Sequence, residues 1–232
     1  MQANKVILNG ETIIDLTQDT VTETDVASGK TFHKADGTTA VGTLVSVNQL
    51  DNMLTDTVTE INSSISAVCS YACYARTKLK MVNLPNATKL GTNAFRACTQ
   101  LVECKAPNAT TLESYLFYVC SNLTSASFPV ATSIPNYCFG SCAKFTKADF
   151  GSATTVNASA FASSSNFQTL ILRSTTMATL ANVNALSGTK IAGGTGYIYV
   201  PKELVDSYKV ATNWSTFSAQ FRAIEDYPDI CG

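Results

Sequence analysis

A strict 22-residue period is the feature that most constrains the fold of this chain. Four successive units begin at Leu90, Leu112, Ile134 and Val156, and a phenylalanine follows five residues after each start. A less regular unit, beginning at Val68, precedes them. A fixed period of this length indicates a stacked architecture, in which each unit buries its apolar side chains only against its neighbours. We therefore expect about five coils, none of which could fold alone.

The same position in successive units holds the same kind of side chain. Three such columns are expected in the core: Phe95, Phe117, Phe139 and Phe161; Cys98, Cys120, Cys142 and Ser164; Leu101, Leu123, Phe145 and Phe167. Alternation before Pro107 predicts a short strand that the proline ends. Small and apolar residues at three- and four-residue spacing between Gly91 and Cys98 predict a helical turn or a short 3₁₀ segment. Each coil should thus hold one strand and one helical turn, with strands of neighbouring coils about 4.8 Å apart.

A family resemblance rests on the motif Gly-x-x-Ala-Phe-x-x-Cys-x-x-Leu, which occupies residues 91–101. It resembles the BspA-like class of leucine-rich repeats, found in bacterial surface proteins and in proteins of tailed phages. The resemblance covers residues 68–173, with Ser164 in place of cysteine in the fourth full unit. It implies an α/β solenoid of BspA-like leucine-rich repeats.

The segment after the repeats resembles the C-terminal cap of such proteins, over residues 196–208 and 213–215. A cap is expected, because an open coil end would expose the core. Pro201 suits the start of a helix. Leu204, Val205, Tyr208 and Ala211 would lie on one face of that helix.

The front of the chain lies outside the repeat and alternates in short apolar segments between glycines, which predicts a small β-rich module. Residues 15–22 and 29–43 resemble an N-terminal segment of tail-associated proteins of phages that infect Gram-positive bacteria. The expected organisation is a β-rich N-terminal attachment module at 1–45, a helical linker or coiled-coil stem at 46–66, the solenoid at 67–175 and the cap at 176–232.

The linker carries apolar residues at three- and four-residue spacing: Val47, Leu50, Leu54, Val58, Ile61 and Ile65. This spacing predicts an amphipathic helix that covers fewer than three heptads. Two interpretations stay open. The helix could pack on the first coil, or it could form the stem of a homotrimer, as the resemblance to phage fibre and tip proteins implies.

Charge is unevenly distributed along the chain. Residues 1–64 hold three Lys/Arg and nine Asp/Glu, whereas residues 65–175 hold nine Lys/Arg and three Asp/Glu. A basic middle segment favours an anionic partner, although many basic faces are only solvated. The basic residues are spread thinly, without a known nucleic-acid-binding signature, so nucleic acid is not an expected partner. The sequence also lacks an apolar stretch of membrane-spanning length and a signal-peptide core at its N-terminus, so neither membrane insertion nor export by the usual secretory route is expected.

No catalytic or cofactor-binding apparatus is expected. The eight cysteines form no paired Cys-x-x-Cys motif and follow the repeat, which favours buried free thiols over a metal site. The single histidine, His33, lies outside the repeat, and the Gly-rich stretch at 193–196 lacks the lysine of a phosphate-binding loop. An enzyme such as a glycan hydrolase is a third interpretation, but the solenoid holds only three acids.

Candidate binding residues come from positions 4 and 7 of the repeat, counted from each unit's first residue. On a helical turn these positions share a face and would form one stripe along the stack. The tyrosine stripe consists of Tyr71, Tyr74, Asn93, Arg96, Tyr115, Tyr118 and Tyr137. Tyrosine and arginine are enriched at binding hot spots, but tyrosines could equally pack between coils with their hydroxyls in water.

A second surface is the strand face: Glu103, Lys105, Ser125, Ser127, Lys147 and Asp149. These residues look like an ordinary solvated surface. The resulting hypothesis is a non-enzymatic phage or prophage virion protein, tail-associated, whose residues 1–45 contact other virion proteins. Its solenoid would bind a bacterial surface protein or an anionic cell-wall polymer. The alternative is an adhesin of the same repeat family on the bacterial cell surface.

Overall fold

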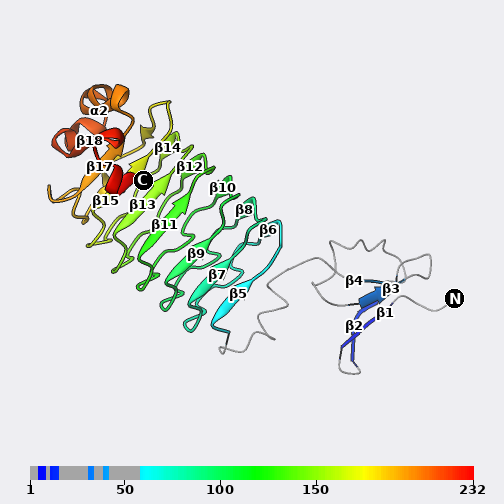
Figure 1. Cartoon of the computed structure of the whole chain (residues 1–232). Helices are drawn as coiled ribbons and strands as arrows, with labels where there is room; N and C mark the ends of the chain where they lie inside the picture. The colour runs from blue at the N-terminus through cyan, green and yellow to red at the C-terminus, as the bar shows by residue number, and fades with distance from the viewer. Residues whose placement is uncertain (1–4, 9–10, 16–30, 34–38, 42–57) are drawn as a thin grey trace. The chain divides into compact units, whose positions relative to one another are not determined.

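The computed structural model describes residues 5–8, 11–15, 31–33, 39–41 and 58–232, in two compact units, Met1–Met53 and Leu54–Gly232. The described strands of the first unit form two antiparallel pairs (Figure 1). β1 (Lys5–Leu8) pairs with β2 (Glu11–Asp15), and β3 (Thr31–His33) pairs with β4 (Thr39–Val41).

The second unit is a solenoid with two parallel strands in most of its coils (Figure 1). One series of strands comprises β5 (Glu60–Asn62), β7 (Met81–Asn83), β9 (Glu103–Lys105), β11 (Ser125–Phe128), β13 (Lys147–Phe150) and β15 (Thr169–Leu172). The second series comprises β6 (Ala67–Val68), β8 (Lys89–Leu90), β10 (Thr111–Leu112), β12 (Ser133–Ile134), β14 (Thr155–Val156) and β16 (Thr179–Leu180). Partners stand one repeat apart, as in Leu90 beside Leu112. The expected solenoid is confirmed, with a second, two-residue strand per coil that the pattern did not predict.

The segment between the two strands of a coil is not the helical turn that was predicted. In each of the five coils that begin between Val68 and Val156, positions 4 and 8 have φ between 53° and 63°, in the left-handed region. The backbone N–H groups here alternate between two kinds of acceptor. Phe95 N and Ala97 N donate to the next coil, to Leu116 O at 3.0 Å and Tyr118 O at 2.8 Å, whereas Ala94 N and Arg96 N donate three residues back within the turn, both at 3.2 Å. Stacking therefore takes every second hydrogen bond that a continuous helix would have needed.

The helix predicted for residues 47–65 lies mostly outside the described residues. For the described part of this segment the helix prediction is wrong, because β5 is a strand that pairs in parallel with β7. Val58, Ile61 and Ile65 are partly exposed at the first coil. Their apolar character therefore reflects the edge of the solenoid. Whether residues 47–57 form a trimeric stem stays a prediction.

The predicted core columns are confirmed. Phe95, Phe117, Phe139 and Phe161 are fully buried, and their ring centroids follow one another at 5.6, 5.4 and 5.5 Å. The neighbouring column uses its sulfur atoms as donors: the thiol of Cys120 donates to Phe95 O at 3.0 Å, and that of Cys142 to Phe117 O at 3.1 Å. Ser164 continues the column, because its hydroxyl donates to Phe139 O at 2.6 Å. Serine thus replaces cysteine without loss of the hydrogen bond.

The cap continues the parallel sheet and adds short helices. β17 (Tyr197–Val200) pairs with β15, and β18 (Phe221–Ala223) pairs with β17. Short helices surround these strands: η2 (Val183–Leu186), η3 (Lys202–Leu204), α2 (Val205–Val210), η4 (Trp214–Gln220), η5 (Ile224–Asp226) and α3 (Pro228–Cys231). Two buried side chains hold the cap on the last coil. Tyr208 Oη accepts from Ala178 N at 2.6 Å, and Trp214 Nε1 donates to Ala178 O at 2.7 Å.

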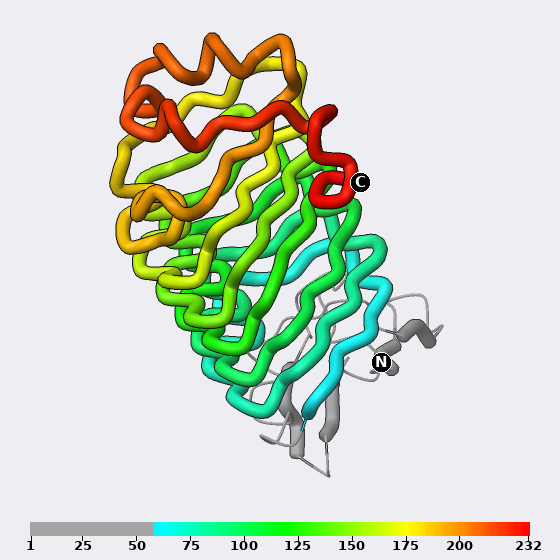
Figure 2. Tube along the Cα trace, turned by 60° about the vertical axis from the view of Figure 1, so that its left-hand side comes forward, coloured from blue at the N-terminus to red at the C-terminus, as the bar shows by residue number. Residues whose placement is uncertain are grey.

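The C-terminal segment lies back across the outer face of the sheet (Figure 2). Lys147 Nζ donates to Ile230 O at 2.6 Å, and Cys231 packs with Ile171 and Tyr199 in a buried cluster. Asp149 accepts two hydrogen bonds from Arg173, whose Nη2 also donates to Cys231 O. The strand face is therefore solvated only in its earlier part, and the interpretation of Lys147 and Asp149 as ordinary surface residues is wrong.

Candidate binding surface

Positions 4 and 7 lie side by side in each coil, although the turn is not helical. The ring centroids of Tyr71 and Tyr74 are 5.9 Å apart. Those of Tyr115 and Tyr118 are 5.6 Å apart, edge to face. Tyr71 and Tyr74 are the most exposed residues of the stripe, at 51% and 44%. The predicted adjacency is thus present, built by two left-handed residues per turn and not by helical spacing.

Contacts between coils join these pairs into one continuous surface. The rings of Tyr115 and Tyr137 stack at 4.8 Å, and Tyr118 meets Tyr137 edge to face at 5.8 Å. Gly140 follows Tyr118 at position 7. A Cβ there would lie 3.0 Å from Tyr118 Cδ2, so the missing side chain gives the tyrosine ring its place. The tyrosine rings are therefore held in defined positions before any ligand arrives.

Arg96 occupies the middle of the stripe, between tyrosines of the preceding and the following coil. Its guanidinium carbon lies over the rings of Tyr74, Tyr115 and Tyr118 at 5.8, 5.6 and 5.2 Å from their centroids. Arg96 Nη1 donates to Asn93 Oδ1 at 3.2 Å. Asn93 is only 4% exposed, so it supports the arginine and is not itself a surface contact, contrary to its predicted role.

The tyrosine hydroxyls of the stripe have no hydrogen-bond partner in the described part of the protein. Within residues 58–232, none of the five stripe tyrosines forms a hydrogen bond through its hydroxyl. Tyr208 in the cap shows the contrast, because its hydroxyl is buried and bonded to Ala178 N. The stripe thus offers aromatic surface together with hydroxyl donors and acceptors that a ligand can bond.

The three acids of the repeat region are all used in ion pairs with basic neighbours. Glu103 lies 3.1 Å from Lys105 Nζ, Glu113 lies 2.7 Å from Lys89 Nζ, and Asp149 pairs with Arg173. Glu113 also accepts from Thr92 N and Thr92 Oγ1 at 2.9 and 2.8 Å. Its hydrogen bond with Lys89, followed by that with Thr92, lowers the pKa of this carboxyl below its ordinary value.

The buried thiols are not suited to nucleophilic chemistry. Burial raises the pKa of Cys98 and of Cys142 to about 12, and it raises the pKa values of Cys120 and Cys138 well above the ordinary value. The thiolate is the reactive form, so these side chains stay neutral and inert at physiological pH. Among the described residues, no group of three or more His, Cys, Asp or Glu is placed to hold a metal ion. The backbone of His33 lies in β3, in the first unit.

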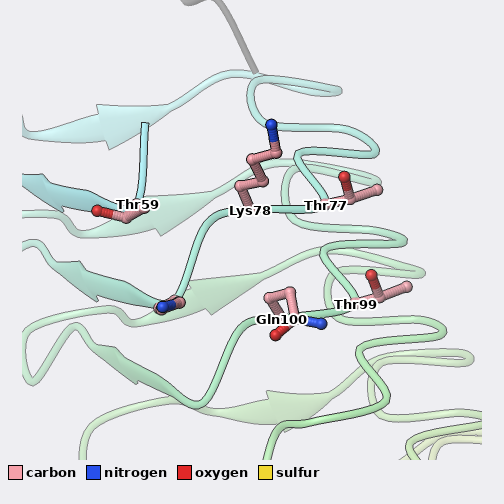
Figure 3. A pocket seen from close by; sticks show the side chains of 6 residues that line it. Thr59, Thr77, Lys78, Thr99 and Gln100 are labelled. Atoms are coloured by element: carbon pink, nitrogen blue, oxygen red, sulfur yellow. The ribbon is translucent and has the colours of Figure 1, made fainter. Parts of the chain in front are cut away.

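A shallow depression of about 430 Å³ lies at the first two coils (Figure 3). It is lined by Thr59, Thr77, Lys78, Lys80, Thr99 and Gln100. Thr77 and Thr99 stand at the same position of successive coils, as Figure 3 shows. The lining has neither an acid nor an aromatic ring, so it provides no catalytic pair and no stacking surface.

These features define a class: a leucine-rich repeat solenoid that presents side chains of successive coils on an extended surface. The chain belongs to the family of the BspA type leucine rich repeat region, because six copies of that repeat match residues 66–187, more than half of its length. The repeat therefore extends past the five coils expected from the sequence. Val156 pairs with Leu180 in strands β14 and β16, a step two residues longer than the 22-residue period, so the strict period does not continue beyond the coil that begins at Val156.

Comparison with solved structures finds similarity to a leucine rich cell surface protein from Faecalibacterium prausnitzii A2-165, solved by crystallography at 1.80 Å resolution. Sequence identity is 24% and the TM-score is 0.49; the match covers 62% of this chain and 37% of that protein. The chain thus spans little more than a third of that protein's length. No curated protein matches the chain. No helix within the described residues has the length and apolar character required to cross a bilayer.

Proposed function

We propose that this chain is a non-enzymatic binding protein of the bacterial surface and that the tyrosine stripe contacts its ligand. Membership of the BspA-type repeat family supports a binding role, because a solenoid of this kind presents an extended surface on a rigid stack. The ligand would be a surface protein or an anionic cell-wall polymer.

One observation carries the proposal: three tyrosines occupy a backbone conformation that disfavours them. Tyr71, Tyr115 and Tyr137 have φ of 62°, 60° and 53°. A left-handed residue with a bulky side chain costs roughly 1–2 kcal/mol, whereas asparagine tolerates this region well. Asn93 occupies position 4 of the second coil, so this position also accepts a residue that tolerates the left-handed conformation with less strain. Strained, partly exposed tyrosines at this position fit a role in which their rings contact a ligand.

The phage-tail interpretation rests on residues 15–22 and 29–43, which lie largely outside the described residues. The phage-tail interpretation stays a proposal. It differs from the cell-surface proposal in where the protein is located, and in both the stripe has the same binding role. Antibodies against the solenoid would separate the two locations. Labelling of intact cells supports a cell-surface protein, whereas labelling only of purified phage particles supports a virion protein.

The binding role is tested with substitutions that the repeat itself uses. The variant Tyr115→Asn/Tyr118→Ala places at positions 4 and 7 the residue types found at Asn93 and Ala162. The matched control, Glu103→Gln/Lys105→Gln, removes an exposed ion pair from the strand face. After fluorescent labelling, the wild-type protein and the control variant should both attach to target bacteria, whereas the tyrosine variant should not. Normal attachment of the tyrosine variant together with loss in the control would move the site to the strand face.

A further inference from the structure

The charge of Arg96 is the most informative part of the stripe, because no acid balances it. Among residues 58–232, none of the ion pairs includes Arg96. Its neighbours are three tyrosine rings and one asparagine amide. Ring faces attract a cation but do not neutralise it, so the guanidinium keeps its full positive charge at the centre of the stripe.

The tyrosines around Arg96 come from the coils on either side of it. Tyr74 belongs to the preceding coil, Tyr115 and Tyr118 to the following one, and all three present ring faces to the guanidinium. A guanidinium has five N–H donors in its plane. The bond from Nη1 to Asn93 uses one of them. The others form the flat fork that pairs with a carboxylate through two parallel hydrogen bonds.

The rings around Arg96 belong to tyrosines whose hydroxyls form no hydrogen bond within residues 58–232. A ligand that fits must carry an anionic group, ring-shaped apolar faces and many hydroxyls. Arginine and tyrosine are enriched at protein interfaces as well, so these residue types alone do not distinguish a protein from a sugar chain. The cation of Arg96 has aromatic ring faces beside it and suits a ligand that carries both a carboxylate and ring-shaped faces, as an acidic sugar chain does. The repeat region is also basic as a whole, with nine Lys/Arg against three Asp/Glu in residues 65–175, which favours an anionic polymer.

Resting on the proposed function of the stripe, we infer that its ligand is an acidic polysaccharide containing uronic acids. A sugar carboxylate pairs with the guanidinium of Arg96, while neighbouring sugar rings pack on Tyr74 and on the Tyr115–Tyr118 pair. The tyrosine hydroxyls bond the sugar hydroxyls. The other coils of the stack contribute further aromatic contacts at Tyr71 and Tyr137.

The test uses three probes with the full chain, measured by calorimetry. Oligogalacturonate has sugar rings and carboxylates, its methyl ester has the rings without the charge, and poly(glycerol phosphate) has the charge without the rings. Oligogalacturonate should bind at least about ten-fold more tightly than either of the others, the scale of one charge-assisted bidentate contact. Arg96→Gln should reduce binding of the acid to the level of the ester and leave the ester unchanged. Lys105→Gln serves as the charge-matched control and should change neither.

Equal binding of acid and ester, or full binding by Arg96→Gln with an unchanged melting temperature, would overturn the inference. If poly(glycerol phosphate) bound most tightly, and bound the Tyr115→Asn/Tyr118→Ala variant equally well, binding would reflect general attraction of polyanions to a basic surface, and the inference would be wrong. If no probe binds or competes, yet the tyrosine variant loses attachment to cells, the ligand is a protein: the inference then fails and the proposed function stands. If the tyrosine variant attaches normally, the proposed function itself fails.

Discussion

Replacing Phe139 with alanine tests whether the solenoid is one cooperative unit. This ring is fully buried at the centre of the stack, with five phenylalanine rings around it. Their centroids lie 4.8–6.4 Å away and belong to Phe117, Phe128, Phe145, Phe150 and Phe161. Deleting a buried phenylalanine costs about 3–5 kcal/mol through lost burial and the cavity that remains. Edge-to-face and stacked ring contacts add to that loss, so we expect a value near the upper limit.

The same reasoning ranks two other variants. Phe95 is equally buried but contacts one phenylalanine ring, Phe117 at 5.6 Å, so Phe95→Ala should cost nearer to about 3 kcal/mol. Phe139→Leu retains most of the apolar volume and should cost less than either alanine variant.

The assay is urea denaturation followed by two signals. Trp214, the single tryptophan, is buried in the cap and reports there by fluorescence, whereas circular dichroism reports the strands of all coils. With a slope of about 2–3 kcal/mol per M, a loss of 4–5 kcal/mol lowers the midpoint by roughly 1.3–2.5 M. Both signals should shift together. An unchanged midpoint would refute the inward position of the column, and a shift in dichroism without a shift in fluorescence would refute the single cooperative unit.

Three further outcomes are expected. Tyr208→Phe should destabilise the cap by about 1–3 kcal/mol, because it leaves the buried N–H of Ala178 without an acceptor; Trp214 fluorescence in urea measures this. The pKa of Glu113 is lower in the folded state, so its carboxylate stabilises the fold above the ordinary pKa of 4.5, and this stabilisation is lost as pH falls through the folded-state pKa. Glu113→Gln should therefore reduce the decrease in melting temperature on acidification. A variant whose melting temperature falls with pH as in the wild type would contradict this. At pH 8, iodoacetamide should leave Cys98 and Cys142, with pKa values of about 12, unmodified in folded protein and modify them in urea, as mass spectrometry would show.

The repeat alone was enough to predict the solenoid and its core, because identical side chains at one position of a coil must stack. Phe95 and Cys98 fell in the core for that reason. The helical turn between them was predicted wrongly, since residues three and four apart suggest a helix when only one coil is considered. The hydrogen bonds that decide the matter run from Phe95 N and Ala97 N to the next coil, and single-chain periodicity does not contain that information.

The candidate site, too, was predicted correctly only in part. The sequence placed Tyr115 and Tyr118 together correctly but could not show that Asn93 is buried beneath Arg96. It also treated Lys147 as a surface residue, because its partner, the carbonyl of Ile230, lies 83 residues away in the chain. Long-range contacts of this kind carry no local signal.

The thiol column has a consequence for the surroundings in which this fold can exist. Cys98, Cys120 and Cys142 stabilise the stack as hydrogen-bond donors, and Ser164 performs the same task with a hydroxyl. This part of the core therefore needs no oxidant in order to fold. Because each thiol is buried and protonated, it also offers no thiolate to peroxide or to disulfide exchange once folded. The column keeps one structure on the reducing and on the oxidising side of a cell envelope.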